Sequence, residues 1–543
     1  MTDFRSKREA ALQRWGQLKT DRSSWLNHWR ELAHFTLPRS GKFLDTDAAQ
    51  APNRGDKKHG HILDNTAQRA VRIATAGLMS GASSPARPWF KLRTPYDDLN
   101  ERPAVKEWLT IVEKRMRDVF NGSNTYRAFR QNYQELTVFG TAGDVMLEDF
   151  DTVLHHYPMT VGEYALDTNS KGKVNTLYRQ FDMRVGQLVE RFGYNQVSRH
   201  AKNMYDRRSL HHWVPVLHAI EPRRERNPLK IDNANMPFAS CYYEMGGQDQ
   251  DYLRESGFQM FPALTPRWET RGADIYGSSP GMETLGDTKQ LQQEQFRKSQ
   301  GIDFMSLPPL QAQSNSKVDM TPGSVSFVDS TQTGAVKNLM DITLDLQHLL
   351  ADIQDVRDRI MQGYYADMFL LIIGDSRVQP VTAREIAERH EEKLLMLGPV
   401  LESLHDEMLS PKIELSFAYM LRSGLIPPPP RDLQNVPLVV KFVSLLAQAQ
   451  QLVGLGSIDR LLGTVASVSE LKPSILDKID TDQLVDVYSD MLGVDPTLIV
   501  ADEQVVFIRE ERAQQEAQQQ AVEAAPQLAK AAKDASAAQP VGA

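Results

Sequence analysis

The chain has 543 residues, of which 41% are hydrophobic, and its 62 basic and 70 acidic side chains leave a formal net charge of -8. This length is too great for one compact domain, and the acidic balance excludes a protein that grips nucleic acid over a broad basic surface. The single cysteine, Cys241, excludes an internal disulfide and a cysteine-built metal site, fits a reducing compartment, and is expected to be a small buried hydrophobe. The longest apolar run, 368–373, is far shorter than the roughly 20 residues that span a bilayer. We therefore expect a soluble multidomain protein with no membrane partner.

The first half of the chain combines helical and strand patterns. Tryptophans and leucines at helical spacing predict a helical start over 5–37, and further helices are predicted over about 64–80 and 102–121. Between 140 and 244 the pattern changes to short apolar runs separated by turn residues, with one helical segment over about 183–192. The clearest strand patterns are 143–147, 176–181 and 213–220.

A polar helix and an extended insert follow. The helix is predicted over about 281–299, and it has so few apolar anchors that it needs packing partners. The insert, 307–328, is proline-containing and has a turn pattern at 321–323. The positions that we single out in the insert are Leu307, Pro308, Pro309, Pro322 and Gly323.

After the insert comes the clearest periodic signal in the chain. Apolar residues alternate at spacings of four and three, which predicts a heptad seam on a helix about 30 Å long. Two helices that flank an extended insert are expected to run in opposite directions, so that the chain extends outward and then returns; we call this arrangement the excursion. The seam positions are Ile342, Leu346, Leu349, Ile353, Val356 and Ile360.

An acidic stripe accompanies this seam. Four aspartates each precede a seam position by one residue, which places them beside the apolar row on the helix. Two interpretations stay open: an ordinary solvated flank of a coiled coil, or a functional surface. The four residues are Asp341, Asp345, Asp352 and Asp355.

Another long helix is predicted to begin at Thr382, which forms a capping box with Glu385. It is expected to continue to Arg422 with kinks at Pro399 and Pro411. The remaining predicted segments are a helical region over 436–508 and an Ala/Gln/Glu-rich tail over 509–543, which is helical at its start.

One motif resembles a catalytic element. Residues 277–281 fit G-x-S-x-G, the nucleophile elbow of α/β-hydrolases. The oxyanion hole of that motif needs the backbone N–H of the residue after the serine, and that residue is Pro280, which has none. We predict instead a loop that begins a helix, with Pro280 in the first turn.

Metal and nucleotide motifs are incomplete. His390 begins an H-E-x-x-H pattern, but Leu394 stands at the second ligand position. The adjacent pairs 155–156 and 211–212 would point to opposite faces of a strand. The glycine-rich segment 55–60 lacks the lysine and hydroxyl of a phosphate-binding loop. We predict no catalytic residue, no cofactor and no metal, and hence a chain that is not an enzyme.

A series of short fragments stands in a specific order and spacing along most of the chain. They are Pro85-x-x-Pro-Trp-Phe90 followed by Leu92, Phe139-Gly-Thr141, Phe261-Pro262, Pro266-Arg-Trp268, Tyr276-Gly277 with Pro280-Gly281, Leu285-Gly-Asp287, Pro322-Gly323, Thr382-Ala-Arg-Glu385, Leu397-Gly-Pro399 and Leu445-x-Ala-Gln-Ala449. Each fragment is weak alone, but together they resemble the head-to-tail connecting, or portal, proteins of short-tailed bacteriophages. The C-terminal tail and the loop over 41–60 fall outside the resemblance.

The resemblance implies a mixed α+β, predominantly helical portal fold that assembles as a dodecameric ring around a DNA channel. The implied parts are an α/β wing region over 1–275, a first stem helix over 276–299, a clip over 300–335, a second stem helix over 336–363, a tunnel loop over 364–381, a kinked long helix over 382–430, a helical crown over 431–508 and a tail over 509–543.

The resemblance also implies partners and a place of action. The ring would sit at one capsid vertex of the virion, at the head–tail junction, after assembly in the host cytoplasm. Double-stranded DNA would pass through it during packaging and ejection, past an acidic channel wall that repels phosphates. The implied protein partners are the terminase motor, tail adaptor and nozzle proteins, and the major capsid and scaffold proteins.

Two alternatives belong to other classes. A packaging enzyme, such as a nuclease or ATPase subunit, would need the phosphate loop or clustered acidic metal site that the sequence lacks. A tail or adaptor protein would be structural, but it would not form a ring of this size with a channel-spanning stem. The mass of the native oligomer distinguishes these hypotheses.

Overall fold

The computed structural model combines helices with antiparallel sheets, as expected, and divides into two units, 1–447 and 448–543. In the first unit the structure describes residues 7–40, 44, 58–230, 232–246, 252–306, 310–312, 336–338, 346–373, 396–433 and 436–443. In the second it describes 465, 483–484, 500, 505, 508–512 and 514–515. Residues 509–512, at the start of the tail, are helical, as predicted. The elements below belong to the first unit.

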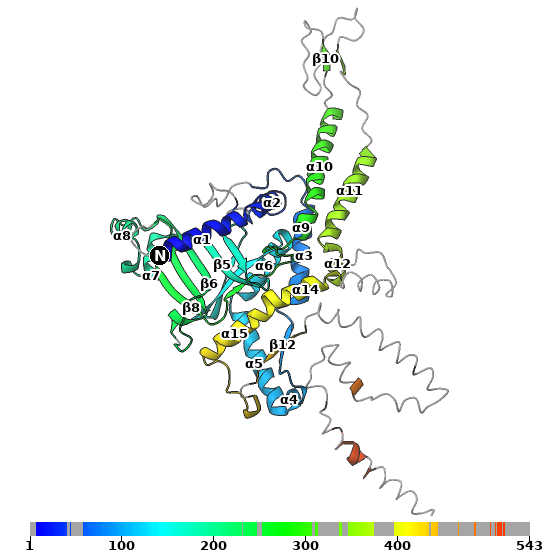
Figure 1. Cartoon of the computed structure of the whole chain (residues 1–543). Helices are drawn as coiled ribbons and strands as arrows, with labels where there is room; N and C mark the ends of the chain where they lie inside the picture. The colour runs from blue at the N-terminus through cyan, green and yellow to red at the C-terminus, as the bar shows by residue number, and fades with distance from the viewer. Residues whose placement is uncertain are drawn as a thin grey trace, which may run out of the picture. The chain divides into compact units, whose positions relative to one another are not determined.

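The helical start consists of two helices, α1 (Lys7–Asp21) and α2 (Ser23–Phe35), that meet at Arg22. The Arg22 side chain is buried and donates a hydrogen bond to the backbone carbonyl of Tyr164. The chain changes direction at this buried arginine. The apolar residues keep their helical spacing across it, so the sequence alone indicated one helical region. Figure 1 shows α1 lying along the five-stranded sheet.

The five-stranded sheet has the order β4-β5-β6-β7-β8, with every neighbouring pair antiparallel. Alternation along β6 sends Val214 and Val216 into the cluster under α7 and α8, and sends Leu217 and Ala219 into the cluster under α1. Both faces are therefore covered, and Cys241 is buried on the α1 side, as expected. The bounds are β4 Tyr164–Thr168, β5 Val174–Arg184, β6 Trp213–Pro222, β7 Phe238–Glu244, β8 Arg254–Phe258, α7 Val185–Phe192 and α8 Arg199–Asp206.

A second group packs helices around a three-stranded sheet with the order β3-β2-β9. Two of its helices, α3 and α5, confirm the predictions over 64–80 and 102–121, whereas no element was predicted over α6, whose buried side includes Asn132 and Glu135. The bounds are α3 Thr66–Ala82, α4 Asp97–Glu101, α5 Pro103–Gly122, α6 Thr125–Phe139, β2 Gly143–Asp149, β3 Val153–Met159 and β9 Ala263–Leu264. Short 3-10 turns cover Tyr194–Gln196, Asn233–Asn235 and Arg431–Leu433.

A long-range strand pair corrects one prediction. Strand β1 (Phe90–Arg93) pairs with β12 (Val439–Phe442), within the region 436–508 that was expected to be helical. The ring of Phe442 stacks on Trp89, with centroids 6.5 Å apart. A partner that lies far away in the sequence gives these four residues their strand conformation, so local periodicity did not reveal it.

The excursion that the sequence predicts is present, with different bounds. The turn α9 (Pro280–Glu283) leads into α10 (Leu285–Ser306), β10 (Leu310–Ala312) pairs with β11 (Val336–Asn338), and α11 spans Leu346–Gly363. Residues 336–338 are therefore strand rather than the beginning of the second helix, and the first helix runs beyond residue 299. In Figure 1, α10 and α11 run side by side.

The segment after α11 also differs from expectation. Residues Ala366–Ile373 form α12, in part of the range 364–381 that was expected to be a loop. Phe369 packs against α3 at Gly77, so burial of its apolar residues favours helix here. The predicted helix start at Thr382 and Glu385, and most of the expected crown and tail, lie outside the described residues.

The kinked helix is described from its later part. Helix α14 (Gly398–Leu404) continues as a π-helical segment, His405–Leu409, into α15 (Ser410–Arg422), which ends where predicted. Pro411 cannot donate a backbone hydrogen bond, and one wide turn before it accommodates the missing donor. The irregularity predicted at this proline is therefore a π-helical turn.

Candidate functional site: the helix pair α10 and α11

The apolar seam of α11 packs inside the chain itself. Ile353, Val356 and Ile360 are all at least 99% buried. They share one core cluster with Leu291 of α10 and Val71 of α3. The heptad pattern thus reflects contacts of α11 with two helices rather than an isolated two-stranded coiled coil.

The other seam positions differ in what the structure describes. Leu349 is partly buried against the same cluster. The side chains of Ile342 and Leu346 lie outside the described residues, although Leu346 begins α11. Burial is therefore established for the half of the seam nearest α12.

Asp64, just before α3, joins both helices of the pair. Gln292 of α10 accepts hydrogen bonds from the backbone N–H groups of Leu63 and Asp64, at 2.7 and 3.0 Å, and donates one to the Asp64 carbonyl at 2.8 Å. Arg357 of α11 donates to the Asp64 carboxylate at 2.8 Å, and the Thr66 hydroxyl does so at 2.6 Å. Burial opposes ionisation, but these hydrogen bonds prevail and lower the pKa of Asp64. Asp64 therefore ties both α10 and α11 to the segment that precedes α3.

The polar character of α10 has two explanations in the structure. Near its start, Thr288 and Gln292 are buried and hydrogen-bonded. Farther along, large apolar side chains are exposed, including Phe296 at 52% and Phe304 at 47%. Exposed apolar groups of this size on one helix are typical of a surface that another chain covers.

The acidic residues of α11 face away from its seam. Asp352 and Asp355 are exposed, beside the buried Ile353 and Val356. Asp355 pairs with Arg359 at 3.3 Å, and Arg359 also reaches Asp287 of α10 at 3.2 Å. Asp352 has no ion pair within the described ranges, so it carries the less compensated charge. Asp341 and Asp345 lie outside the described residues.

The clip positions are not described. Leu307, Pro308, Pro309, Pro322 and Gly323 all lie outside the described residues. What the structure gives for this region is the β10–β11 ladder, which pairs Leu310 with Asn338 and Ala312 with Val336. In the chain, this ladder lies between the end of α10 and the beginning of α11.

Ser279 caps the helix whose start the sequence predicts at Pro280. Its hydroxyl accepts a hydrogen bond from the backbone N–H of Met282 at 3.1 Å and donates one to the Val138 carbonyl at 2.7 Å. The side chain is 99% buried, and Pro280 begins the helix. A hydroxyl that is buried and satisfied in both directions is a structural group, not a nucleophile.

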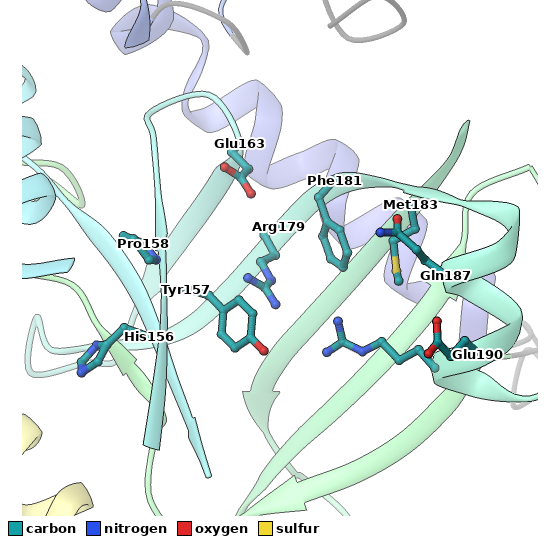
Figure 2. Close-up of a pocket in the computed structure, with 10 residues that line it drawn as sticks. His156, Tyr157, Pro158, Glu163, Arg179, Phe181, Met183, Gln187 and Glu190 are labelled. Carbon is teal, nitrogen blue, oxygen red and sulfur yellow. The ribbon is translucent and has the colours of Figure 1, made fainter. Parts of the chain in front are cut away.

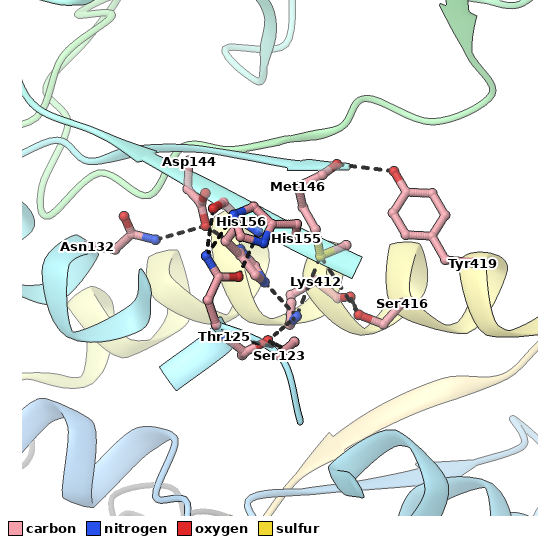
Figure 3. Close-up of polar contacts among 11 residues, drawn as sticks. Ser123, Thr125, Asn132, Asp144, Met146, His155, His156, Lys412, Ser416 and Tyr419 are labelled. Atoms are coloured by element: carbon pink, nitrogen blue, oxygen red, sulfur yellow. Dashed lines mark hydrogen bonds and ion pairs between the residues drawn. The ribbon is translucent and has the colours of Figure 1, made fainter. Parts of the chain in front are cut away.

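The histidine pairs behave differently from each other. His211 and His212 are exposed and precede β6, so they are not strand residues as assumed. In β3, His155 and His156 do point to opposite faces, and His156 is buried. Figure 3 shows His156 between Asp144 and Lys412: its Nδ1 lies 2.5 Å from the Asp144 carboxylate and its Nε2 lies 2.7 Å from Lys412 Nζ.

This buried network was missed at the level of sequence. In its ammonium form Lys412 Nζ only donates, so Nε2 of His156 accepts from it and Nδ1–H of His156 donates to Asp144. Burial lowers the pKa of His156 and lowers the pKa of Lys412 well below its usual range. The network attaches α15 to the β2–β3 hairpin, and no local motif marks Asp144 or Lys412.

The described residues form neither a metal-binding cluster nor a membrane-spanning helix. Across those residues there is no group of three or more histidine, cysteine, aspartate or glutamate side chains suited to holding a metal ion. Likewise, none of the helices formed by the described residues has the length and apolarity needed to cross a membrane.

A family model and two similar proteins agree in what they match. The family model described as "Bacteriophage head to tail connecting protein" matches residues 8–500. The "Probable portal protein" of Bordetella phage BPP-1 is 50% identical over 521 residues, which cover 95% of this chain and 93% of that protein. The "Portal protein" of Salmonella phage epsilon15 is 43% identical over 535 residues, covering 97% and 95%. A chain in the solved "Virion of native gene transfer agent (GTA) particle" matches at a TM-score of 0.33 and 11% identity over 74% of this chain and 86% of that chain, a likeness too low to support an argument.

Proposed function

Because the chain belongs to the family of bacteriophage head to tail connecting proteins and is a phage portal protein, we propose that it forms a dodecameric ring at one capsid vertex. DNA passes through this ring during packaging and ejection. The terminase motor and the tail adaptor and nozzle proteins dock on it, and the major capsid and scaffold proteins surround it. The observation that carries this proposal is the similarity to two portal proteins, 50% and 43% identical over nearly the full chain.

In this proposal α10 and α11 are the two stem helices and the β10–β11 ladder is the base of the clip. The five-stranded sheet with α1 forms the wing. The kinked segment through α14 and α15 leads toward the crown, and α12 lies within the range of the tunnel loop. The Asp64 contacts support this map, because they hold two long helices in a fixed direction relative to the wing.

Ring formation is supported by the exposed apolar side chains of α10. Phe296 and Phe304 are about half exposed in the isolated chain. Contact with a neighbouring stem would remove them from water, at roughly 25 cal/mol per Å² of apolar surface. A ring offers each subunit two such neighbours.

Native mass measurement tests assembly. The wild-type protein should have twelve times the subunit mass. Phe296→Asp combined with Phe304→Asp should give folded monomers, because charged side chains in an apolar interface oppose association. Phe150→Asp is the matched control: Phe150 is fully exposed outside the stem, and its replacement should leave the ring intact. A wild-type monomer at micromolar concentration would contradict ring formation.

The acidic face of α11 is proposed to line the channel. Twelve copies of Asp352 would form a circle of negative charge, felt by a phosphate backbone within roughly 8 Å at physiological salt. DNA then stays centred and slides. Asp355 should contribute less than Asp352, because Arg359 compensates it.

Charge reversal tests this role. Asp352→Lys should leave rings assembled and make DNA retention salt-sensitive, with slower packaging. Asp352→Asn should have a milder effect, because it removes repulsion without adding attraction, and Asp355→Lys should fall between the two. A label at position 352 that reacts only from outside the ring would show that the stripe is a solvated flank.

We also propose that the chain has no catalytic activity. Ser279 should resist serine-directed fluorophosphonate probes, because its hydroxyl is buried and hydrogen-bonded. ATP or DNA hydrolysis that copurifies with the ring through every step would support the packaging-enzyme alternative.

Docking of the motor is assigned to the clip. Replacing 307–328 by a short flexible linker should leave rings intact and abolish motor binding, since exposed strand edges provide pairing partners. Loss of the ring itself would place that segment in the assembly interface instead.

A further inference from the structure

A cavity of about 540 Å³ lies beside the five-stranded sheet, between β3, β5 and α7. Figure 2 shows Tyr157 and Arg179 on one side of it and Gln187 and Glu190 on the other. Arg191 of α7 also lines it. The cavity belongs to the wing region, away from the proposed stem.

Arg179 is held in one orientation by buried groups. Its side chain is 96% buried, and its Nε donates a hydrogen bond to Nδ1 of His218 at 3.1 Å. Nε2 of His218 lies 2.9 Å from the Ser240 hydroxyl. Burial, together with the charges of Arg179 and Arg191, lowers the pKa of His218 well below its usual range. The neutral ring therefore accepts at Nδ1 and donates from Nε2.

Aromatic rings flank the guanidinium group. Its carbon lies 4.9 Å from the ring centroid of Phe181 and 5.6 Å from that of Tyr157. Such contacts favour a cation and fix the plane of the group. Within the described residues, Nη1 and Nη2 have no hydrogen-bond acceptor. A buried arginine that uses only Nε is oriented for a partner that the chain does not supply.

The charges around the cavity indicate what that partner is. Arg191 adds a second positive charge, held by a 3.4 Å hydrogen bond to the Tyr242 hydroxyl. Glu163 and Glu190 also line the cavity, so a polyanion such as DNA would meet two carboxylates there. One planar carboxylate needs only the two parallel N–H groups of a guanidinium.

We propose that this cavity binds one acidic side chain of a polypeptide, whose carboxylate pairs with Nη1 and Nη2 of Arg179. Two sources supply that chemistry: a second copy of this chain, or a separate protein that docks on the wing. The contacts that orient Arg179 lie within one chain and do not depend on ring formation.

A pair of peptides tests the proposal. Acetyl-Ala-Glu-Ala-amide and acetyl-Ala-Gln-Ala-amide differ only in the carboxylate, and saturation-transfer NMR suits weak ligands of a large protein. With the cavity open, either in the wild-type ring or in dissociated subunits, the full chain should bind the glutamate peptide about tenfold more tightly, a difference of about 1.4 kcal/mol. Equal binding of the two peptides under all conditions overturns the proposal without reference to any variant.

Variants then locate the contact. Arg179→Lys keeps the charge and removes the planar fork, so it should abolish the preference for glutamate. Arg191→Gln, at an exposed position, should weaken binding of the glutamate peptide while the preference persists. Circular dichroism checks that Arg179→Lys is folded. A folded Arg179→Lys protein that keeps the full preference also overturns the proposal.

The source follows from comparing two preparations. The same titration is run on wild type and on the Phe296→Asp, Phe304→Asp protein. Discrimination by both preparations indicates that a separate protein supplies the side chain. Discrimination by the dissociated subunits alone indicates that a second copy already fills the cavity. If neither preparation prefers the glutamate peptide, the proposed site is refuted. Ring mass is measured separately, so a failure of assembly is not confused with a failure of the cavity to bind.

Discussion

Nζ of Lys412 on α15 lies 2.7 Å from Nε2 of His156 on β3, and neither side chain is more than 1% exposed. On its other side His156 bonds to Asp144, so a cation and a carboxylate share one imidazole in the interior. The ammonium group also lies 3.0 Å from the Thr125 hydroxyl and 4.3 Å from the centre of the Phe120 ring. The charge is thus paired, hydrogen-bonded and placed over an aromatic face.

Removing either charge should be costly, and removing both should cost less than the sum. Lys412→Met should lower the free energy of unfolding by about 3–5 kcal/mol, because it leaves the Asp144 carboxylate buried without its cation. Urea denaturation of Lys412→Met, Asp144→Asn and the double variant measures their coupling. The exposed Lys106→Met should change stability by less than about 0.5 kcal/mol. Additive single effects would show that the two charges do not interact.

Glu135 should make stability fall as pH rises. Burial raises the pKa of Glu135 to about 7, although the Thr160 hydroxyl donates to it at 2.9 Å. Since this pKa is raised on folding, the contribution of the group is complete below the unfolded value near 4.5 and is lost as pH rises through about 7. Glu135→Gln should therefore gain stability relative to wild type by about 2–3 kcal/mol between pH 4.5 and 8. Denaturation of wild type and Glu135→Gln at pH 5, 6, 7 and 8 measures this difference. A difference in the free energy of unfolding that stays constant across these pH values would refute the prediction.

The seam of α11 should be sensitive to truncation. Ile353 is 99% buried among α3, α10 and α11, so Ile353→Ala should destabilise the chain by about 2–5 kcal/mol. Ile111 on α5 provides a matched control, because it is 38% exposed and its replacement by alanine should change stability far less. Chemical denaturation of both variants, in the Phe296→Asp, Phe304→Asp background, separates packing from assembly. Similar losses for the two would contradict the packing described for α11.

Gly77 should not tolerate a side chain. A Cβ added there would lie 2.1 Å from Cγ of Phe369, so α3 and α12 would have to separate. Gly77→Ala should destabilise by about 1–3 kcal/mol through overpacking. Gly16→Ala, in α1 with no atom within 4 Å of the new Cβ, should stabilise by about 0.5–1 kcal/mol through its helix preference. Thermal unfolding that ranks the two variants in the opposite order would contradict the close approach of α3 and α12.

Local chemistry made a large part of the fold predictable. Helical spacing located α3, α5 and α11 to within a few residues at the ends the structure describes, and short apolar runs between turn residues located β2, β5 and β6. Pro280 excluded a hydrolase nucleophile elbow, because it lacks the backbone N–H that the oxyanion hole needs. The structure shows Ser279 as a helix cap. The order of short motifs along the chain gave the family, which full-length comparison confirmed.

Predictions were wrong where a distant partner decides the conformation. Val439–Phe442 is a strand because Phe90–Arg93 pairs with it, and 366–373 is helical because Phe369 packs on α3. The channel-facing role of Asp352 and the clip positions stay predictions, since a single chain contains no channel.

By itself, the sequence determined the periodic elements, the absence of complete catalytic motifs and the family, because each depends on neighbouring residues or on their order. Only the tertiary structure placed Lys412 beside His156 and placed Arg179 in a cavity where no described residue accepts a hydrogen bond from its Nη1 or Nη2. Those groups come from separate strands and helices, and their pairing depends on burial. Removal from water makes an unpaired charge expensive, and the sequence does not reveal which residues share an interior until the chain has folded.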